Sequence, residues 1–271
     1  MKVALFCGGL GTRMREYSQV LPKPLADIRQ RPILWYVMRY YAHYGYNDFI
    51  LCTGYKANLI KAYFDHHAQG GDQPFVLPDT TGDVTLYGER IADWKVQCVE
   101  TGLHSSIGDR LRAIEPLIGD DERFMANYSD GVTDLHLPTL VDYAIKRDRI
   151  GTFLAVRPNH SFHTVRLSDC DMVTSITDLK DSGVQINGGY FVFKRDIFKH
   201  VRPNEELVSE PFARLIEQEQ LVAYRHRGYW ACMDTFKDKT QLEKMIETGQ
   251  ATWQVWQNTP DQLIKAPLHR A

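Results

Sequence analysis

Long apolar runs, paired cysteines and an excess of either charge are all missing from this sequence of 271 residues. Because its apolar runs are too short to cross a bilayer, we expect no membrane-spanning segment. The five cysteines are scattered, odd in number and never paired as in metal sites, which favours small buried thiols in a reducing compartment. A formal net charge of -2 argues against a nucleic-acid-binding protein that relies on bulk positive charge, but not against a local basic pocket.

Internal repeats, low-complexity segments and a second hydrophobic unit large enough for an independent domain are also absent from the sequence. A hydrophobic share of 44% and a charged share of 24% are ordinary for a soluble globular protein. We therefore predict one domain over residues 1–271, with an insertion or hairpin over about 68–92 and a C-terminal tail over 249–271. The N-terminus enters a predicted strand at once, so we expect no signal peptide and a cytoplasmic protein.

Strands and helices alternate from the start of the chain. Residues 3–7 and 48–52 are apolar runs typical of buried strands, and residues 33–44 and 57–64 have helical spacing. This order predicts an α/β fold, a single Rossmann-like, doubly wound mixed sheet with inserted hairpins. Further along we expect strands at 94–99, 124–128, 152–156, 186–193 and 221–224, helices at 108–117, 137–147, 211–218 and 237–246, and a hairpin over 164–176.

The first predicted strand ends in three closely spaced glycines, Gly8, Gly9 and Gly11. Glycine allows a sharp turn and a close approach of the backbone to a ligand, so its N–H groups suit phosphate oxygens. Arg13 can hold a phosphate through two parallel hydrogen bonds, and Lys23, fixed between two prolines, supplies a compact charge. The spacing fits neither the dinucleotide fingerprint nor the Walker loop. A phosphate-binding turn explains this combination better than a plain tight turn beside two surface cations.

Two aspartates also follow predicted strands. Asp130 comes directly after the strand at 124–128 and precedes Gly131, and Asp234 stands late in the chain after another strand. Each alone is more often a turn or cap residue. Together at the carboxyl edge of a sheet, they would supply the one or two carboxylates with which proteins hold Mg²⁺ beside a nucleoside triphosphate.

Several short motifs occur in a characteristic order. Residues 8–13 read Gly-Gly-Leu-Gly-Thr-Arg, residues 127–132 read Asn-Tyr-Ser-Asp-Gly-Val, and residues 229–235 read Tyr-Trp-Ala-Cys-Met-Asp-Thr. They are accompanied by Pro22-Lys23-Pro24, Gly54-Tyr55-Lys56, Thr101-Gly102, Gly108-Asp109-Arg110-Leu111 and Ile186-Asn187-Gly188-Gly189. Over nearly the whole chain this series resembles the sugar-nucleotide pyrophosphorylases, and within them it is most similar to the glucose-1-phosphate cytidylyltransferases.

That resemblance implies the nucleotidyltransferase (GT-A-like) architecture and a reaction in which an NTP and a hexose 1-phosphate give an NDP-hexose and pyrophosphate. CTP and glucose 1-phosphate are the implied substrates, Mg²⁺ the implied cofactor, and a homo-oligomer the implied assembly. The implied catalytic residues are Arg13 and Lys23, and the implied metal ligands are Asp130 and Asp234. For the nucleotide, the resemblance implies Leu5, Cys7, Gly8, Gly9, Gly11, Thr12, Arg110 and Ser129. For the sugar phosphate, it implies Lys180, Asn187 and Gly188.

One departure from the family pattern concerns the sugar phosphate. The broader family has Glu-Lys-Pro shortly before Asn-Gly-Gly, with the lysine on the phosphate, whereas residues 177–183 here read Thr-Asp-Leu-Lys-Asp-Ser-Gly. Lys180 from a shifted position, another cation, or a merely solvated lysine all remain open. So do three other functions: a sister enzyme that uses dTTP or UTP, a nucleotide-sugar glycosyltransferase, and a non-catalytic nucleotide-sensing subunit.

Plainer interpretations are favoured elsewhere. Asp169-Cys170-Asp171 imitates the Asp-x-Asp of metal-dependent glycosyltransferases, but it falls between two short alternating segments and is better explained as a hairpin turn. The adjacent histidines at 66–67 lack a zinc-like framework. Trp253 and Trp256 have helical spacing and are expected to cover a core or a subunit surface.

Overall fold

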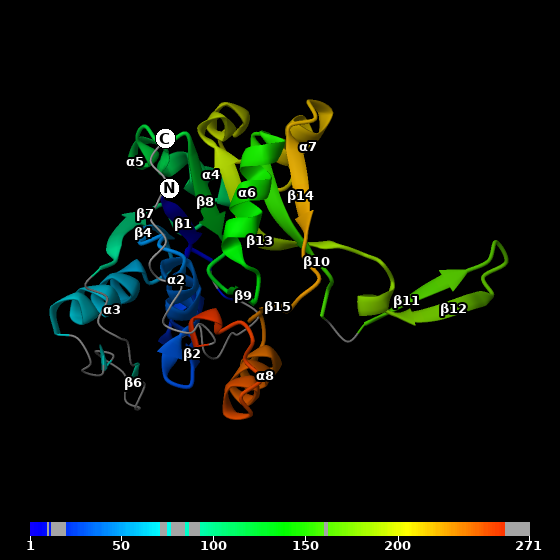
Figure 1. Ribbon diagram of the computed structural model, residues 1–271, viewed down its shortest axis with the longest axis horizontal. Coiled ribbons are helices and arrows are strands. Elements are labelled where there is room, and N and C mark those ends of the chain that lie inside the picture. Colours follow the sequence, from blue (N-terminus) through cyan, green and yellow to red (C-terminus); the bar gives the residue numbers. More distant parts are fainter. Residues whose placement is uncertain are drawn as a thin grey trace.

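A seven-stranded sheet forms the centre of the computed structural model (Figure 1), which describes residues 1–9, 11, 20–70, 75–76, 85–86, 93–159 and 162–257. The strand order is β14-β10-β13-β8-β1-β4-β7. These strands are β1 (Val3–Phe6), β4 (Asp48–Thr53), β7 (Lys95–Glu100), β8 (Arg123–Asn127), β10 (Gly151–Val156), β13 (Ile186–Lys194) and β14 (Leu221–Arg225).

The pairing directions confirm the predicted mixed, doubly wound sheet. Strand β1 runs parallel to β4 and β8, β4 runs parallel to β7, and β10 runs parallel to β14. Strand β13 is antiparallel to both β8 and β10. Six strands therefore end at the same edge of the sheet, which is where ligands of open α/β sheets bind.

Helices cover both faces because successive side chains of each strand point to opposite sides. Val3 and Leu5 pack in the core beneath α2 (Ile33–His43), α3 (Ala57–Gly70) and α6 (Leu137–Arg147). Ala4 and Phe6 pack in the opposite core, beneath α4 (Ile107–Ala113), α5 (Glu115–Ile118), η4 (Arg195–His200) and α7 (Glu210–Glu217). Burial on both faces explains why β1 is a continuous apolar run.

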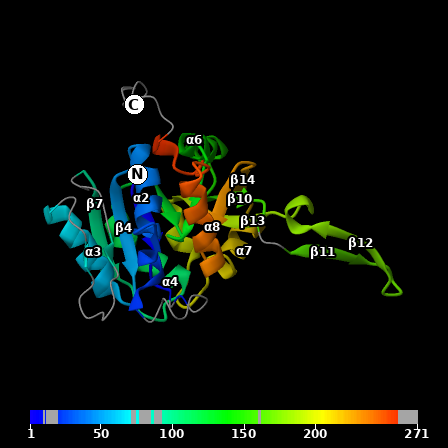
Figure 2. The same ribbon diagram turned by 90° about the horizontal axis from the view of Figure 1, so that it is seen from below.

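Small elements surround this sheet. The ribbons are β2 (Asp27–Ile28) with β3 (Arg31–Pro32), β5 (Phe75–Val76) with β6 (Thr85–Leu86), β9 (Gly131–Thr133) with β15 (Trp230–Cys232), and β11 (His163–Leu167) with β12 (Val173–Asp178). The last of these confirms the predicted hairpin over 164–176, and it projects from the body in two perpendicular views (Figures 1 and 2). The remaining elements are η2 (Lys23–Leu25), η3 (Leu179–Asp181), α8 (Phe236–Glu247) and η5 (Val255–Gln257).

Some local expectations differ from the structure. The helix predicted at 108–117 is divided into α4 and α5 at Ile114, close to Pro116, which has no N–H to continue an α-helix. Cys170 is exposed, although buried thiols were expected, while the other four cysteines are buried or half-buried. Trp253 is buried in the core. Within the described residues, no helix is long and apolar enough to span a bilayer.

Two predicted segments lie mainly outside the described residues. Of the insertion expected at 68–92, the structure describes the end of α3 and the two short strands β5 and β6. Of the tail expected at 249–271, it describes residues up to 257.

Candidate active site

A cavity of about 520 Å³ opens at the carboxyl ends of β1 and β8. Its walls come from the glycine turn, from η2, from the segment after β8, from the start of α4, and from the segments preceding α7 and α8. The cavity is lined by Phe6, Cys7, Gly9, Gly11, Lys23, Pro24, Ile107, Tyr128, Ser129, Asp130, Glu206, Val208 and Asp234. Strand ends that are distant in sequence thus meet in one cavity, as the sequence predicts.

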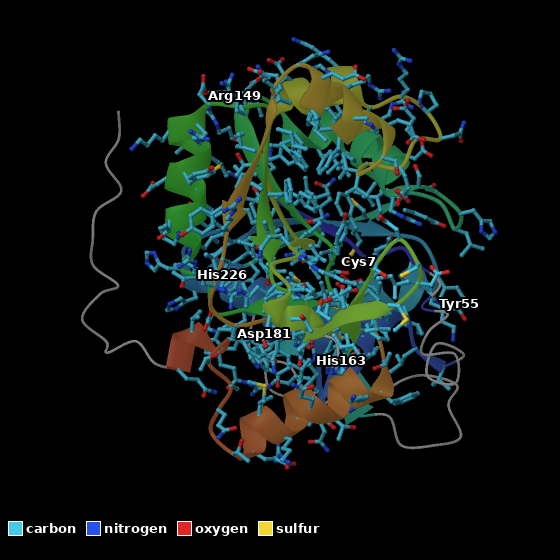
Figure 3. The ribbon with its side chains drawn as sticks, turned by 90° about the vertical axis from the view of Figure 1, so that its right-hand side faces the viewer. Cys7, Tyr55, Arg149, His163, Asp181 and His226 are labelled. Atoms are coloured by element: carbon cyan, nitrogen blue, oxygen red, sulfur yellow. The ribbon has the colours of Figure 1, made fainter. Side chains whose placement is uncertain are left out.

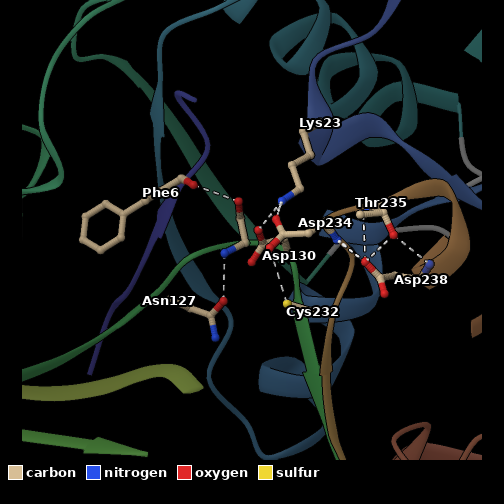
Figure 4. Close-up of polar contacts among 9 residues, drawn as sticks. Phe6, Lys23, Asn127, Asp130, Cys232, Asp234, Thr235 and Asp238 are labelled. Carbon is tan, nitrogen blue, oxygen red and sulfur yellow. Dashed lines mark hydrogen bonds and ion pairs between the residues drawn. The ribbon is translucent and has the colours of Figure 1, made fainter. Parts of the chain in front are cut away.

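Lys23 lies between the two predicted metal ligands (Figure 4). Its Nζ donates to Asp130 Oδ2 at 2.7 Å and to Asp234 Oδ1 at 2.5 Å. The lysine is the first residue of η2, where Leu25 N donates to Pro22 O and Ala26 N donates to Lys23 O. This tight turn and the flanking prolines fix the backbone from which the lysine reaches the carboxylates.

The turn after β8 fixes Asp130. Ser129 has a φ of 68°, a left-handed conformation, and its N–H donates to Asn127 Oδ1 while its Oγ donates to Phe6 O at 2.8 Å. That second bond ties the segment after β8 to the end of β1. Because Gly131 pairs with Cys232, the β9–β15 ribbon brings Asp130 beside Asp234.

Asp234 lies just before α8. Its N–H donates to Asp238 Oδ2, and Thr235 forms a capping box with Asp238 at the start of the helix. Capping satisfies N–H groups that the first turn of a helix leaves unpaired, so it fixes where the helix begins. The cap therefore holds the chain from which the carboxylate of Asp234 projects.

The three charges influence one another strongly. Burial alone would lower the pKa of Lys23, but contacts with Asp130 and Asp234 outweigh burial and raise that pKa. Burial raises the pKa of Asp130, and the lysine opposes this change. A lysine with a raised pKa stays protonated at neutral pH. The cavity therefore contains a fixed positive charge between two carboxyl groups.

The glycine turn packs against Arg110, a residue that is almost wholly buried. Arg110 Nη2 donates to Gly8 O at 2.9 Å, and Nη1 donates to Thr101 Oγ1 at 2.7 Å and to Thr53 O at 3.3 Å. A Cβ built on Gly8 would come within 1.9 Å of this guanidinium. The family resemblance links residues 54–56, 101–102 and 108–111 to the nucleotide pocket. The beginning of the first segment and the other two meet at this arginine. Among the described residues Arg110 lies behind the glycine turn and does not line the cavity.

Other predicted nucleotide contacts are placed as follows. Gly9 and Gly11 line the cavity, as do Cys7 and Ser129. Leu5 is fully buried within β1. Thr12 and Arg13 lie outside the described residues.

The predicted sugar contacts border a second cavity of about 370 Å³. Asn187 lines it, and Val208 contributes to both cavities, so the two adjoin. Asn187 Nδ2 donates to Tyr128 OH at 3.2 Å, and Trp230 Nε1 donates to Gly188 O at 2.8 Å. These bonds position the start of β13 beside the cavity that contains Lys23.

Lys180 is not brought to either of these cavities. It lies in η3, its side chain is 62% exposed, and its Nζ is 3.2 Å from Asp178 Oδ2. Asp169 and Asp171 lie in the turn of the projecting hairpin, where Asp171 N donates to Ser168 O. The hairpin-turn interpretation of this acidic pair is confirmed.

Sequence reasoning missed part of the cavity wall. Ile107, Glu206 and Val208 line the cavity from the start of α4 and from the segment before α7. No spacing or motif marks them, because they reach the cavity through tertiary packing. One such contact is the hydrogen bond from Ser106 Oγ to Glu205 O at 2.7 Å.

Hard cations such as Mg²⁺ take oxygen ligands, and Asp130 and Asp234 present them here. The lysine ammonium already occupies the space between these carboxylates, which shows that the pair accommodates a cation. In the described part of the chain, no group of three or more His, Cys, Asp or Glu side chains forms a metal site. The two carboxylates would therefore need further oxygens from a phosphate chain or from water.

Comparison with known proteins identifies the family of this chain. Residues 2–248 match the family model described as nucleotidyl transferase. The chain belongs to this family. It is 35% identical over 260 residues to the glucose-1-phosphate cytidylyltransferase of Salmonella typhi, a match that covers 95% of this chain and 100% of that protein. The same identity and coverage are found for the glucose-1-phosphate cytidylyltransferase of Salmonella typhimurium.

A solved structure shares the nucleotidyltransferase fold. The crystal structure of UDP-glucose pyrophosphorylase complexed with UDP-glucose superposes with a TM-score of 0.66 at 15% identity, covering 92% of this chain and 99% of that one. This nucleotidyltransferase thus has the mixed α/β architecture that its sequence predicts.

Proposed function

We propose that this nucleotidyltransferase converts CTP and glucose 1-phosphate into CDP-glucose and pyrophosphate. The observation that carries the proposal is the position of Lys23 between Asp130 and Asp234, in a cavity bounded by the glycine turn. The relatives at 35% identity, named glucose-1-phosphate cytidylyltransferases, support the choice of substrates.

The reaction needs little from the protein in the way of proton transfer. Its nucleophile is an oxygen of the sugar phosphate, which is already anionic near neutral pH. The requirement is to bring two polyanions together in line and to neutralise their charge. A fixed ammonium, backbone N–H groups and paired carboxylates suit this task better than they suit acid–base chemistry.

We assign the leaving phosphates to the glycine turn. Gly9 lines the cavity, and among the described residues its N–H has no hydrogen-bond partner, so it can donate to an anion. Lys23 would neutralise charge at the α-phosphate, where bond exchange takes place. The remaining proposed nucleotide contacts are Leu5, Cys7, Gly8, Gly11, Thr12, Arg13, Arg110 and Ser129.

We assign Mg²⁺ to Asp130 and Asp234. When bound, the ion would withdraw charge from phosphate oxygens and help to align them. Lys23 would then exchange its carboxylate contacts for phosphate contacts, because its flexible stem allows the ammonium to move. The sugar would lie against Asn187 and Gly188, in the adjoining cavity of about 370 Å³.

A matrix of CTP, UTP, dTTP, ATP and GTP against several hexose 1-phosphates tests the proposal, with pyrophosphate release as the signal. We expect CTP with glucose 1-phosphate to give the highest kcat/KM, and no release when the sugar phosphate is omitted. A higher kcat/KM for UTP or dTTP would instead favour the sister enzymes. Transfer of sugar from a nucleotide sugar to an acceptor, without pyrophosphate release, would contradict the assignment.

We also propose that the protein forms a homo-oligomer through the projecting hairpin. One face of the β11–β12 ribbon carries Val165, Leu167, Val173 and Ile176, each more than half exposed. An isolated two-stranded ribbon is marginally stable, and a second copy offers the same apolar face in return. In sedimentation analysis, the variant Val165→Ser/Ile176→Ser should dissociate, whereas Thr164→Ser/Thr177→Ser on the other face should not. A monomeric wild-type protein would contradict this proposal.

A further inference from the structure

Three arginines gather where two neighbouring parallel strands end. Ala155 of β10 pairs with Arg225 of β14, and His226 N donates to Ala155 O at 2.9 Å. Arg157 therefore leaves the end of β10 beside Arg225 and Arg227. The proposed active site lies at the same edge of the sheet, at the ends of β8 and β1 in the middle of the strand order, whereas β10 and β14 lie at one end of that order.

A separate cavity of about 180 Å³ lies among these arginines. It is lined by Arg157, Gly183, Gln185, Arg225, His226 and Arg227. Pockets for whole drug-sized ligands usually measure roughly 300–1,000 Å³, so this cavity suits a single chemical group rather than a nucleotide.

No carboxylate belongs to the described lining of this arginine cavity. Within the described part of the chain, the guanidinium groups of Arg157, Arg225 and Arg227 have no hydrogen-bond or ion-pair partner. His226 does have one, since its Nε2 lies 2.9 Å from Asp134 Oδ1. Three arginines thus line one small cavity whose described lining contains no carboxylate.

The acidic residues nearby are placed elsewhere. Asp178 pairs with Lys180. Asp181 borders a neighbouring cavity of about 200 Å³, which shares Arg157 and Gln185 with the arginine cavity. Asp181 and His226 are both labelled in Figure 3, on the side from which the hairpin projects. Neither aspartate therefore belongs to the described lining of the arginine cavity.

We propose that the arginine cavity binds a phosphomonoester dianion. Guanidinium groups match phosphate oxygens through paired hydrogen bonds, and among the described lining residues no carboxylate competes for them. The cavity adjoins the one lined by Asn187, because Gln185 and Arg225 line both. The bound phosphate therefore has two possible sources. One is a second phosphate at the far end of a sugar 1-phosphate, an alternative that rests on the proposed function. The other is a free phosphorylated metabolite.

Direct binding tests the cavity without any turnover. Inorganic phosphate and glucose 6-phosphate are titrated calorimetrically, at low ionic strength, into the full-length wild-type protein and into Arg157→Gln/Arg227→Gln. We expect binding to the wild type and a loss of affinity of about tenfold or more in the double variant. Arg112→Gln/Arg195→Gln, which removes two exposed arginines elsewhere, should bind like the wild type. Equal affinity in all three proteins, or no binding to the wild type, would overturn the proposal.

Steady-state kinetics then show whether the phosphate in the arginine cavity belongs to the sugar substrate or to a free metabolite. If the sugar carries the phosphate, glucose 1,6-bisphosphate should have a kcat/KM about tenfold above that of glucose 1-phosphate, and Arg157→Gln/Arg227→Gln should lose that advantage. If the phosphate belongs to a free metabolite, glucose 6-phosphate should change the rate with glucose 1-phosphate in the wild type alone. Binding of phosphate without any pyrophosphate release would leave the arginine site standing and refute the proposed function.

An acidic segment of a second copy is the competing occupant. Asp169 and Asp171 lie in the turn of the projecting hairpin. If Arg157→Gln/Arg227→Gln changed the sedimentation coefficient while phosphate binding stayed at the wild-type value, the arginines would form a protein interface. That result would overturn the phosphate site.

Discussion

Lys23 and Asp234 are separated by 211 positions in the sequence, yet Lys23 Nζ lies 2.5 Å from Asp234 Oδ1. The contact joins a turn near the start of the chain to the segment before α8, and Asp130 contributes a second carboxylate from the middle of the chain. Distant parts of the chain thus provide the charges that a reaction between two polyanions requires.

Removing the ammonium should suppress catalysis. For Lys23→Ala we expect turnover to fall by about 10²–10³, because a preorganised cation at the reacting phosphate is lost. Steady-state pyrophosphate release measures this fall, and near-ultraviolet circular dichroism checks the fold. Lys199→Ala, which removes an exposed lysine on η4, serves as the control and should retain the wild-type rate. A near-wild-type rate for Lys23→Ala would refute its role.

Metal affinity should depend on the carboxylate before α8. We expect Asp234→Asn to weaken Mn²⁺ binding by about tenfold or more, because an amide is a poorer ligand than a carboxylate for a hard cation. The affinity is measured in the presence of CTP by electron paramagnetic resonance, which detects free Mn²⁺. Asp196→Asn, at an exposed carboxylate paired with Lys199, should leave the affinity unchanged. Equal affinities in all three proteins would remove Asp234 from the metal site.

The glycine turn offers a matched pair of substitutions. Gly8→Ala should lower the free energy of unfolding by about 1–3 kcal/mol, because the new Cβ overlaps the buried guanidinium of Arg110. Gly9→Ala should change it by no more than about 0.5 kcal/mol, because nothing lies within 4 Å of a Cβ there. Urea denaturation gives both values. If the two variants unfolded alike, the close packing of Arg110 against Gly8 would be wrong.

Low pH should reduce the stability of the segment that carries Glu206 and Val208. Glu205 forms a bidentate ion pair with Arg214, and these hydrogen bonds lower the pKa of Glu205 to about 2. The unfolded-state pKa is about 4.3. Because the folded-state value is the lower one, the stabilisation is complete above about pH 4.3 and disappears as the pH falls towards about 2.

The variant Glu205→Gln isolates this effect. The difference in free energy of unfolding between wild type and variant should be constant from about pH 8 to pH 5 and should shrink below about pH 4.3. Denaturant titrations over that range provide the measurement. If the difference grew on acidification, the pKa of Glu205 would be raised in the folded protein and not lowered.

Much of the fold could be predicted from the sequence because its signals are local. Apolar runs ending in glycine or polar residues marked β1, β4 and β8, and the strand-end rule placed Asp130 and Asp234 at one edge. Lys23 was marked by the two prolines that flank it. The division of α4 from α5 at Ile114 was missed, although Pro116 was the available signal. Periodicity alone gave no reason to end a helix there.

The rest depends on packing that a sequence does not display. Arg110 remains a proposed nucleotide residue, and no motif indicates that its guanidinium lies behind the glycine turn, where it donates to Gly8 O. Glu206 and Val208 reach the cavity because the segment before α7 folds against α4. Arg157, Arg225 and Arg227 share a cavity only because β10 and β14 are neighbours, and that pairing carries no motif.

The most direct test of the active-site assignment compares pyrophosphate release by the wild type and by Asp130→Asn, with CTP, glucose 1-phosphate and Mg²⁺ in one assay. We expect the wild type to release one pyrophosphate for each CDP-glucose formed, and the variant to be slower by about 10²–10³ while remaining folded. Equal rates in the two proteins would contradict the account.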